Sequence, residues 1–136
     1  MQLSLDNNLE QYSIRAYDAE GIQLIVPTAL SDSDRPVIQR IDYSIILSPR
    51  SMRAWSPTHV DEIEVAHFEE LLEWEPEVAL FGSGSRLRFP APELLAPLHR
   101  RGIGIEVMDT AAACRTFNIL ASEGRRVTAA LLMFVD

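Results

Sequence analysis

The stretch from Val78 to Leu132 most constrains the fold, because its hydrophobic pattern alternates between that of a strand and that of a helix. Short apolar strands are predicted at Val78–Phe81, Ile103–Met108 and Val127–Val135. The order strand–helix–strand–helix–strand favours parallel neighbours joined by crossover helices. The last strand is apolar at nearly every position, which is typical of a central strand that is covered on both faces.

Two helices are predicted between these strands. The first begins near Pro92 and ends at Gly102, after two arginines that suit the negative end of a helix. The second is capped by Asp109 or Thr110 and ends at Gly124. Their buried faces are predicted to consist of Leu94, Leu95 and Leu98 in the first helix, and of Ala113, Phe117, Leu120 and Ala121 in the second.

The first half of the chain has the pattern of β-structure. Apolar residues alternate on both sides of a turn at Asp18–Gly21, which predicts a hairpin with Gly21 at positive φ. One further strand is predicted between Val37 and Leu47, ended by Pro49. The residues that define these strands are Tyr12, Ile14, Ala16, Ile22, Leu24, Val26, Val37, Ile41, Tyr43, Ile45 and Leu47.

Three further segments before Val78 lie outside these predicted strands. Ser31–Pro36 has the composition of a loop, and Arg50–His59 is predicted to be irregular. An acidic helix is predicted within Asp61–Trp74, and its glutamates form either a solvated face or a partner surface. The apolar residues that share one face of this helix are Val65, Phe68 and Leu72.

The length of 136 residues fits a single α/β (or α+β) domain over residues 1–136, with a mixed sheet. The longest apolar run, Val127–Val135, is far shorter than the roughly 20 residues that cross a bilayer, so no membrane insertion is expected. The first eleven residues do not have the pattern of a secretory signal. Cys114 is the one cysteine and cannot form an intrachain disulfide, so a soluble, cytoplasmic protein is expected.

The net charge of −8 is unevenly distributed. Residues 1–80 contain five arginines and 15 acidic residues, whereas residues 81–136 contain seven arginines and five acidic residues. Nucleic-acid binding needs a basic face, which so few arginines do not provide, and we expect no nucleic-acid partner. The chain has no lysine, which excludes Schiff-base chemistry and a phosphate loop with the usual lysine.

Ligands of such sheets bind beyond the carboxyl ends of the parallel strands. Two loops are predicted there, a glycine loop at residues 82–85 and the turn at Asp109 and Thr110. Backbone N–H groups of the glycine loop, together with arginine side chains, would form a crevice for a small anionic ligand. The candidate ligand-binding residues are Gly82, Ser83, Gly84, Arg86, Asp109, Thr110, Arg115 and Asn118.

These residues also have a purely structural interpretation. The glycine loop fits a tight turn, and Arg115 and Asn118 fit bonds to loop carbonyls that hold the crossover together. The loop is not a dinucleotide fingerprint, since Leu87 occupies the position of the third glycine. The structural and the ligand-binding interpretations both remain open from sequence.

No catalytic or metal-binding group stands out. Cys114 belongs to the buried side of its helix, which favours an inert thiol over a reactive one. His59, His67 and His99 match no metal-ligand spacing, and the serines of the glycine loop do not lie in a G-x-S-x-G motif. The pattern favours a non-catalytic protein, and no metal or cofactor is predicted.

Three segments carry a resemblance to a known family: Pro76–Gly84, Phe89–Pro90 and Ile105–Leu132. Within the last segment the matching residues are Glu106, Val107, Met108, Thr110, Arg115, Thr116, Asn118, Glu123 and Arg126. Upstream the match is limited to Tyr17, Gly21, Tyr43, Pro49 and Trp55. On these residues the chain resembles a family of unknown biochemical function that includes mitochondrial complex I assembly factor three and the adipogenesis-associated domain-containing protein, most strongly over residues 76–132.

The resemblance implies a compact α/β fold of its own type, with no established cofactor or reaction. Ser83 stands where members often have threonine, whereas Phe117 replaces a frequent tyrosine, so a role for that phenol cannot be carried over. We expect a bacterial member that acts as a non-catalytic binding or assembly module with a protein partner. The alternative is a protein or enzyme that binds a small anionic or phosphorylated ligand in the crevice at residues 82–85 and 109–110.

Overall fold

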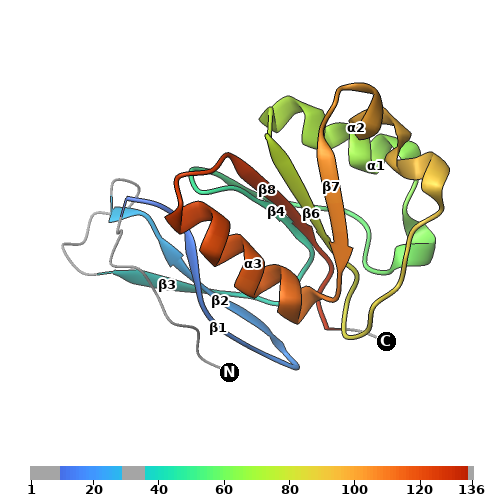
Figure 1. Ribbon diagram of the computed structural model, residues 1–136. Helices are drawn as coiled ribbons and strands as arrows, with labels where there is room; N and C mark the ends of the chain where they lie inside the picture. The colour runs from blue at the N-terminus through green and yellow to red at the C-terminus, as the bar shows by residue number, and fades with distance from the viewer. Residues whose placement is uncertain (1–9, 29–35, 135–136) are drawn as a thin grey trace.

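The computed structural model describes residues 10–28 and 36–134 and shows two β-sheets, with helices packed around the larger one (Figure 1). The strands are β1 (Ser13–Asp18), β2 (Gly21–Val26), β3 (Val37–Ile41), β4 (Ile45–Leu47), β5 (Met52–Ala54), β6 (Val78–Gly82), β7 (Gly104–Met108) and β8 (Val127–Leu131). The α-helices are α1 (Val65–Glu69), α2 (Ala96–Arg100) and α3 (Thr110–Ser122), and the 3₁₀ helices are η2 (Val60–Glu62), η3 (Glu70–Trp74) and η4 (Pro92–Leu95).

The larger sheet has the strand order β5-β4-β8-β6-β7, and the smaller one has the order β1-β2-β3. Strand β6 pairs in parallel with both β7 and β8, whereas β4 pairs antiparallel with β5 and β8. The smaller sheet is antiparallel throughout. The mixed sheet, the parallel C-terminal crossovers and the N-terminal hairpin that the sequence predicts are therefore confirmed.

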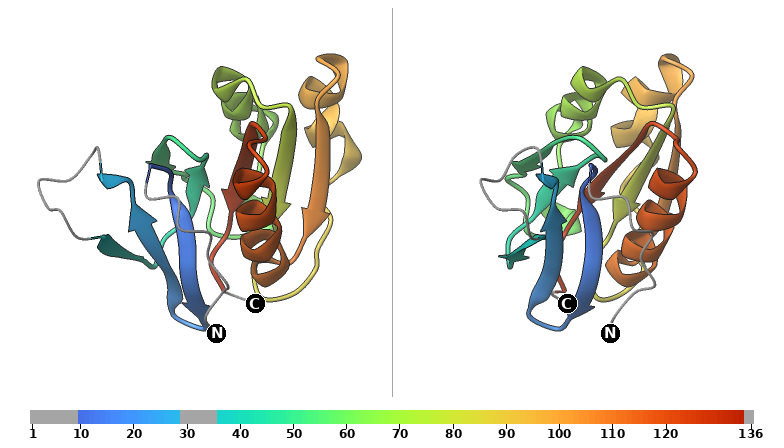
Figure 2. Two further views of the ribbon diagram at one scale, coloured as in Figure 1. Left: turned by 60° about the vertical axis from the view of Figure 1, so that its left-hand side comes forward. Right: turned by 90° about the vertical axis from the view of Figure 1, so that its left-hand side faces the viewer.

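The larger sheet is covered on both faces, by different elements (Figure 2). Helix α3 packs against β6 and β8 and also contacts β1, so the small sheet lies on the same side as this helix. On the other side α1, α2 and η4 contact one another. Strand β8 serves both layers, because Ala129 belongs to the core under α3, whereas Ala130 belongs to the core under α1 and α2.

The predicted elements of the second half are confirmed with small shifts. Strand β8 is buried along its whole described length and lies in the interior of the sheet order. The first predicted helix begins as the 3₁₀ helix η4 at Pro92 and continues as α2, with Leu98 fully buried. Helix α3 is capped by Asp109 and buries Ala113 and Phe117, and the residues at which the two helices were predicted to end, Gly102 and Gly124, have positive φ.

The single strand that was predicted between Val37 and Leu47 is wrong. The structure forms two strands there, β3 in the small sheet and β4 in the large sheet. Between them the chain leaves one sheet for the other, and the Ser44 carbonyl accepts a hydrogen bond from the Trp55 N–H at 2.8 Å. Strand β5 lies in the segment that was predicted to be irregular, because the Ser48 hydroxyl closes a turn that pairs β4 with β5.

The predicted acidic helix is interrupted rather than continuous. It consists of η2, α1 and η3, with Ile63 and Glu64 extended between the first two. Phe68 and Leu71 are fully buried, whereas Val65, which was predicted to share a face with Phe68 and Leu72, is exposed. Most of the predicted loop Ser31–Pro36 lies outside the described residues.

Among the described residues, no helix has the length and apolar character needed to cross a membrane.

Gly21 is predicted to be the glycine least able to accept a side chain. It has φ of 153°, and a Cβ there would lie 2.1 Å from the Ile41 carbonyl oxygen. Gly21→Ala should lower the free energy of unfolding by at least about 3 kcal/mol, because a backbone collision is added to the strain. Gly102→Ala is the matched control, since Gly102 has φ of 72° but no atom within 4 Å, and it should cost about 1–2 kcal/mol. Equal losses in urea unfolding would contradict the prediction.

Candidate functional site

The predicted crevice lies where β6 and β7 end. The two strands are parallel neighbours with Gly82 opposite Met108, so their carboxyl ends lie side by side as expected. The loops that follow are bonded to the neighbouring strand and to each other: the Ser83 N–H donates to the Met108 carbonyl at 2.9 Å, and the Thr110 N–H donates to the Gly84 carbonyl at 2.9 Å. The two loops therefore share one rim.

Thr110 occupies the centre of this rim and is fully buried. Its Oγ1 accepts a hydrogen bond from the Gly84 N–H at 2.9 Å and donates one to the Leu132 carbonyl at 2.6 Å. Gly82 is required by this close packing, because a Cβ there would lie 2.9 Å from Thr110 Oγ1. The hydroxyl thus connects the ends of three strands, and its donor is used within the protein.

The Ser83 hydroxyl also makes its hydrogen bonds within the protein. Ser83 is buried, and its hydroxyl donates to the Arg86 carbonyl at 2.7 Å and accepts from the Arg88 N–H at 3.0 Å. These bonds hold residues 83–88 in a fixed turn. Arg86 lies on the exposed part of that turn.

The remaining predicted residues are distributed along α3. Asp109 caps the helix, with Oδ1 accepting from the Ala112 N–H at 2.8 Å. Arg115 donates from Nη1 to the hydroxyl of Tyr17 at 2.7 Å. Asn118 bonds both backbone groups of Ile14, accepting from the N–H at 2.9 Å and donating to the carbonyl at 2.7 Å. Arg115 and Asn118 therefore join α3 to β1. Binding of an anion by the eight candidate residues named from the sequence stays a prediction.

Two of the three histidines, His59 and His67, stabilise local structure. His59 Nδ1 accepts from the Asp61 N–H at 3.2 Å, and His67 Nδ1 accepts from the Glu64 N–H at 2.8 Å. Both residues stabilise the starts of short helices. Over residues 10–28 and 36–134, no group of three or more His, Cys, Asp or Glu side chains is arranged to hold a metal ion.

Sequence reasoning missed the exposed apolar side chains of the loop after Ser83. Leu87 is 53% exposed and Phe89 is 72% exposed. The signal was the alternation of arginine and apolar residues in Arg86–Phe89, which looks like a strand but has no strand beside it. It also missed a pocket of about 640 Å³ at the opposite end of the large sheet.

Thr110 allows a direct test of the structural interpretation of the rim. Thr110→Val keeps the shape but leaves the Gly84 N–H and the Leu132 carbonyl unpaired in a buried place, so the free energy of unfolding should fall by about 2–4 kcal/mol. Thr110→Ser keeps the hydroxyl and should cost about 1 kcal/mol for the lost methyl group. Chemical denaturation checks both variants, and a valine variant as stable as the serine variant would refute the assignment.

Burial raises the pKa of the Cys114 thiol to about 12, an effect that the nearby Arg115 only partly offsets. The ordinary value is 9.0, so stability that depends on the protonated thiol is lost as pH rises from 9.0 towards 12. At about pH 8 the native thiol should react with iodoacetamide at least about 100-fold more slowly than the thiol of the denatured chain. Similar rates in the two states would show that Cys114 is accessible and ionisable.

Comparison with known proteins places this fold in a family. Residues 14–132 match the family described as "Protein of unknown function (DUF498/DUF598)". The NADH dehydrogenase (ubiquinone) 1 alpha subcomplex assembly factor 3 of Bos taurus is 31% identical over 126 residues, which cover 91% of this chain and 59% of the bovine protein. The chain therefore spans little more than half the length of that relative.

Solved structures share the fold over nearly the whole chain. The crystal structure of a protein from Bordetella parapertussis has a TM-score of 0.76 and 32% sequence identity, covering 90% of this chain and 95% of that one. An NMR structure of a Bordetella pertussis protein, described as a Mth938-like domain, has a TM-score of 0.72 and 28% identity, covering 97% and 92%. The chain belongs to the DUF498/DUF598 family of unknown function, in agreement with its resemblance to complex I assembly factor three.

Proposed function

We propose that the protein is a non-catalytic module that binds a partner protein and supports the assembly of a larger complex. The bovine relative is named as an assembly factor, and the family has no assigned reaction. The polar side chains at the predicted crevice are bonded within the protein, as Thr110 and Ser83 illustrate. These observations support a binding role over a catalytic one.

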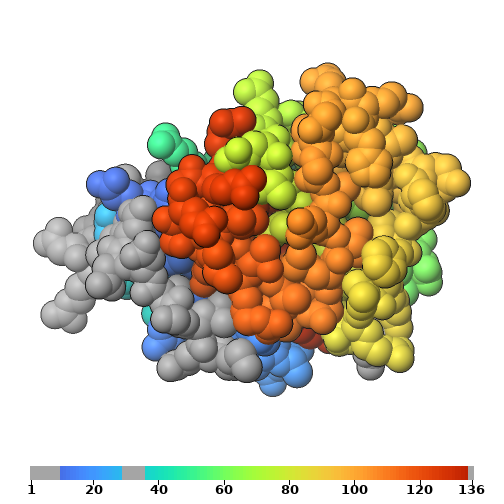
Figure 3. All heavy atoms as spheres, viewed as in Figure 1, coloured from blue at the N-terminus to red at the C-terminus, as the bar shows by residue number. Residues whose placement is uncertain are grey.

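The observation that carries the proposal is the docking loop, defined here as residues 85–90. It presents Leu87 and Phe89 to solvent. The loop lies at an edge of the molecule, near the end of β7 (Figure 3). An exposed phenylalanine beside an exposed leucine is an apolar patch of the kind that marks protein contacts. Aromatic side chains also supply much of the binding free energy of interfaces.

The docking loop is held in one conformation. The Ser83 hydroxyl fixes its start, the following Pro90 is buried, and Arg88 Nη1 lies 2.7 Å from His59 Nε2. A loop that is already ordered loses less conformational entropy on binding than a mobile one. The exposure of Leu87 and Phe89 is therefore a fixed feature of the folded protein.

Charge further defines the partner surface. Arg86 and Arg88 flank Leu87, in the half of the chain that has more arginines than acidic residues. The partner surface that fits this loop is an apolar depression with carboxylates on its rim.

We propose that the binding module acts in the cytoplasm of a bacterium. The solved relatives from Bordetella and the free thiol of Cys114 support this location.

The double variant Leu87→Ser/Phe89→Ser tests the docking loop. A tagged chain expressed in its native host should recover a partner in stoichiometric amount, and the double variant should bind that purified partner at least about 30-fold more weakly. Because both side chains are exposed, the melting temperature should hardly change. Binding is measured by calorimetry or surface plasmon resonance.

Ile119→Ser is the matched control, since Ile119 is 57% exposed but lies on α3, away from the docking loop. It should leave the affinity unchanged. The proposal fails if the native chain recovers no stoichiometric partner. It also fails if the double variant binds the partner as tightly as the control does.

A further inference from the structure

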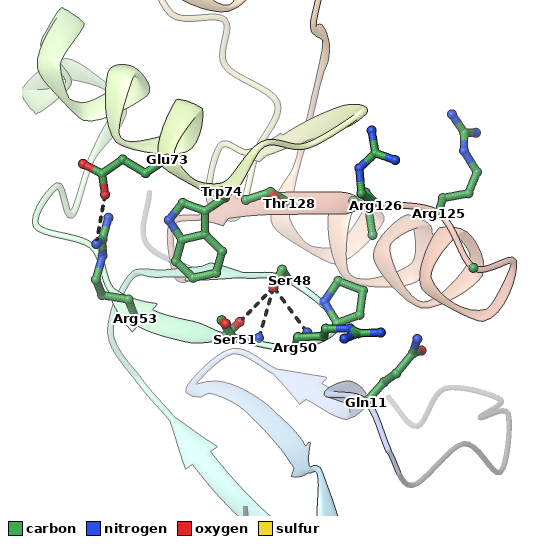
Figure 4. A pocket seen from close by; sticks show the side chains of 13 residues that line it. Gln11, Ser48, Arg50, Ser51, Arg53, Glu73, Trp74, Arg125, Arg126 and Thr128 are labelled. Carbon is green, nitrogen blue, oxygen red and sulfur yellow. Dashed lines mark hydrogen bonds and ion pairs between the residues drawn. The ribbon is translucent and has the colours of Figure 1, made fainter. Parts of the chain in front are cut away.

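A pocket of about 640 Å³, whose lining side chains are drawn in Figure 4, opens at the end of the large sheet where the parallel strands begin. It lies where β4 ends and β8 begins, with Thr128 and Trp74 in its wall. Clefts that bind small molecules usually measure about 300–1,000 Å³. The size of this pocket therefore fits a metabolite rather than a macromolecular surface.

The pocket is rich in arginine although the protein is acidic. Four arginines line it, together with one carboxylate, that of Glu73, while the net charge of the chain is −8. The four arginines are Arg50, Arg53, Arg125 and Arg126. Guanidinium groups bind carboxylates and phosphates with two parallel hydrogen bonds, so this concentration of them favours an anionic ligand.

Two of the arginines are already paired with carboxylates. Arg53 lies 3.4 Å from Glu73 and 3.6 Å from Glu70, and Arg125 lies 3.6 Å from Glu77. These pairs reduce the charge that Arg53 and Arg125 can offer to a ligand.

The other two, Arg50 and Arg126, form no salt bridge within the described part of the chain, although the charge of Arg126 helps to lower the pKa of Glu77. Arg126 makes one long contact through Nε, 3.5 Å from the Glu75 carbonyl. In Figure 4, Arg50 and Arg126 lie on different segments of the chain around the opening, and the guanidinium of Arg126 points away from Arg50. Arginine side chains are long, and rotation of Arg126 toward Arg50 would place the two guanidinium groups on either side of one oxyanion.

The backbone beneath both arginines is held in place. The Ser48 hydroxyl accepts from the Arg50 N–H at 3.3 Å, and the Glu77 carboxylate accepts from the Arg126 N–H at 2.8 Å. That backbone bond is the main reason that the pKa of Glu77 is lowered, so its carboxylate keeps this role at neutral pH. The backbone from which the two arginine side chains extend is therefore held by hydrogen bonds.

Trp74 gives the pocket an aromatic wall. The guanidinium of Arg53 lies 5.6 Å from the centre of the indole ring. The next residue, Glu75, has φ of 48° and ψ of 51°, a left-handed conformation that costs a non-glycine residue about 1 kcal/mol or more. Such strain often accompanies functional sites, and here it occurs directly beside Trp74.

We propose that this arginine pocket, formed by Arg50, Arg53, Trp74, Arg125 and Arg126, binds a small organic anion. Its carboxylate or phosphate group lies between Arg50 and Arg126, and its planar or apolar part packs against Trp74. This site is separate from the predicted crevice and from the docking loop.

The test uses the full chain labelled with ¹⁵N and three probes: inorganic phosphate, citrate and adenosine monophosphate. The indole N–H of Trp74 should shift with citrate or with adenosine monophosphate at about 10 mM, which saturates a site with a Kd of about 1 mM. The indole N–H of Trp55 is an internal control, because Trp55 is buried, does not line the pocket and donates to the His67 carbonyl. The three probes separate carboxylate from phosphate and show whether a planar group is needed.

Arg50→Gln and Arg126→Gln should each weaken binding about tenfold or more, since each removes a charged hydrogen bond. Arg101→Gln is the matched control, because Arg101 is exposed and does not line the pocket. Unchanged melting temperatures without probe show that the variants fold. The proposal is overturned if no probe shifts Trp74, if both tryptophans shift together, or if Arg101→Gln weakens binding as much as the pocket variants.

Discussion

The two-sided burial of β8 is the constraint on which the rest of the structure depends. This strand lies between β4 and β6, and its alternate side chains enter two different cores. The small side chains of Ala129 and Ala130 leave room on one face for Phe117 of α3, and on the other for the edge-to-face pair of Phe68 and Phe81, whose ring centres lie 5.4 Å apart. Because β8 fixes the register of both neighbours, it also fixes where every loop of the large sheet emerges.

The two ends of the sheet differ because their polar groups are used differently. At the carboxyl ends of the parallel strands, the Thr110 hydroxyl and the backbone bonds of Ser83 and Leu132 close the space between the loops. At the opposite end, backbone bonds between Glu77 and Arg126 align the strand starts, but long arginine side chains surround an open pocket. Short hydroxyl side chains close one end, whereas long charged side chains leave the other end accessible.

Much of this arrangement could be predicted from the sequence, and the failures have physical causes. The parallel strands and α3 were predicted because their hydrophobic periods are regular and local. The change of sheet after Ile41 could not be seen, since the alternation of apolar residues continues through Tyr43 to Ile45 without a break. The meeting of the loops at the rim followed from parallel pairing, but the inward orientation of Thr110 did not. The arginine pocket joins Arg50 to Arg126 through the pairing of β4 with β8, and no local pattern encodes such a long-range pairing.

Strand β6 is the most direct connection between the arginine pocket and the docking loop. It begins next to Glu77 and ends at Gly82, and its five residues span about 16 Å. Communication between two sites requires an element with two discrete arrangements. Strand β6 is hydrogen-bonded on both edges and buries four of its five residues, so no second arrangement is available to it. Occupation of the arginine pocket and docking of a partner are therefore expected to be energetically independent, and the fold then serves as a rigid support for two separate surfaces.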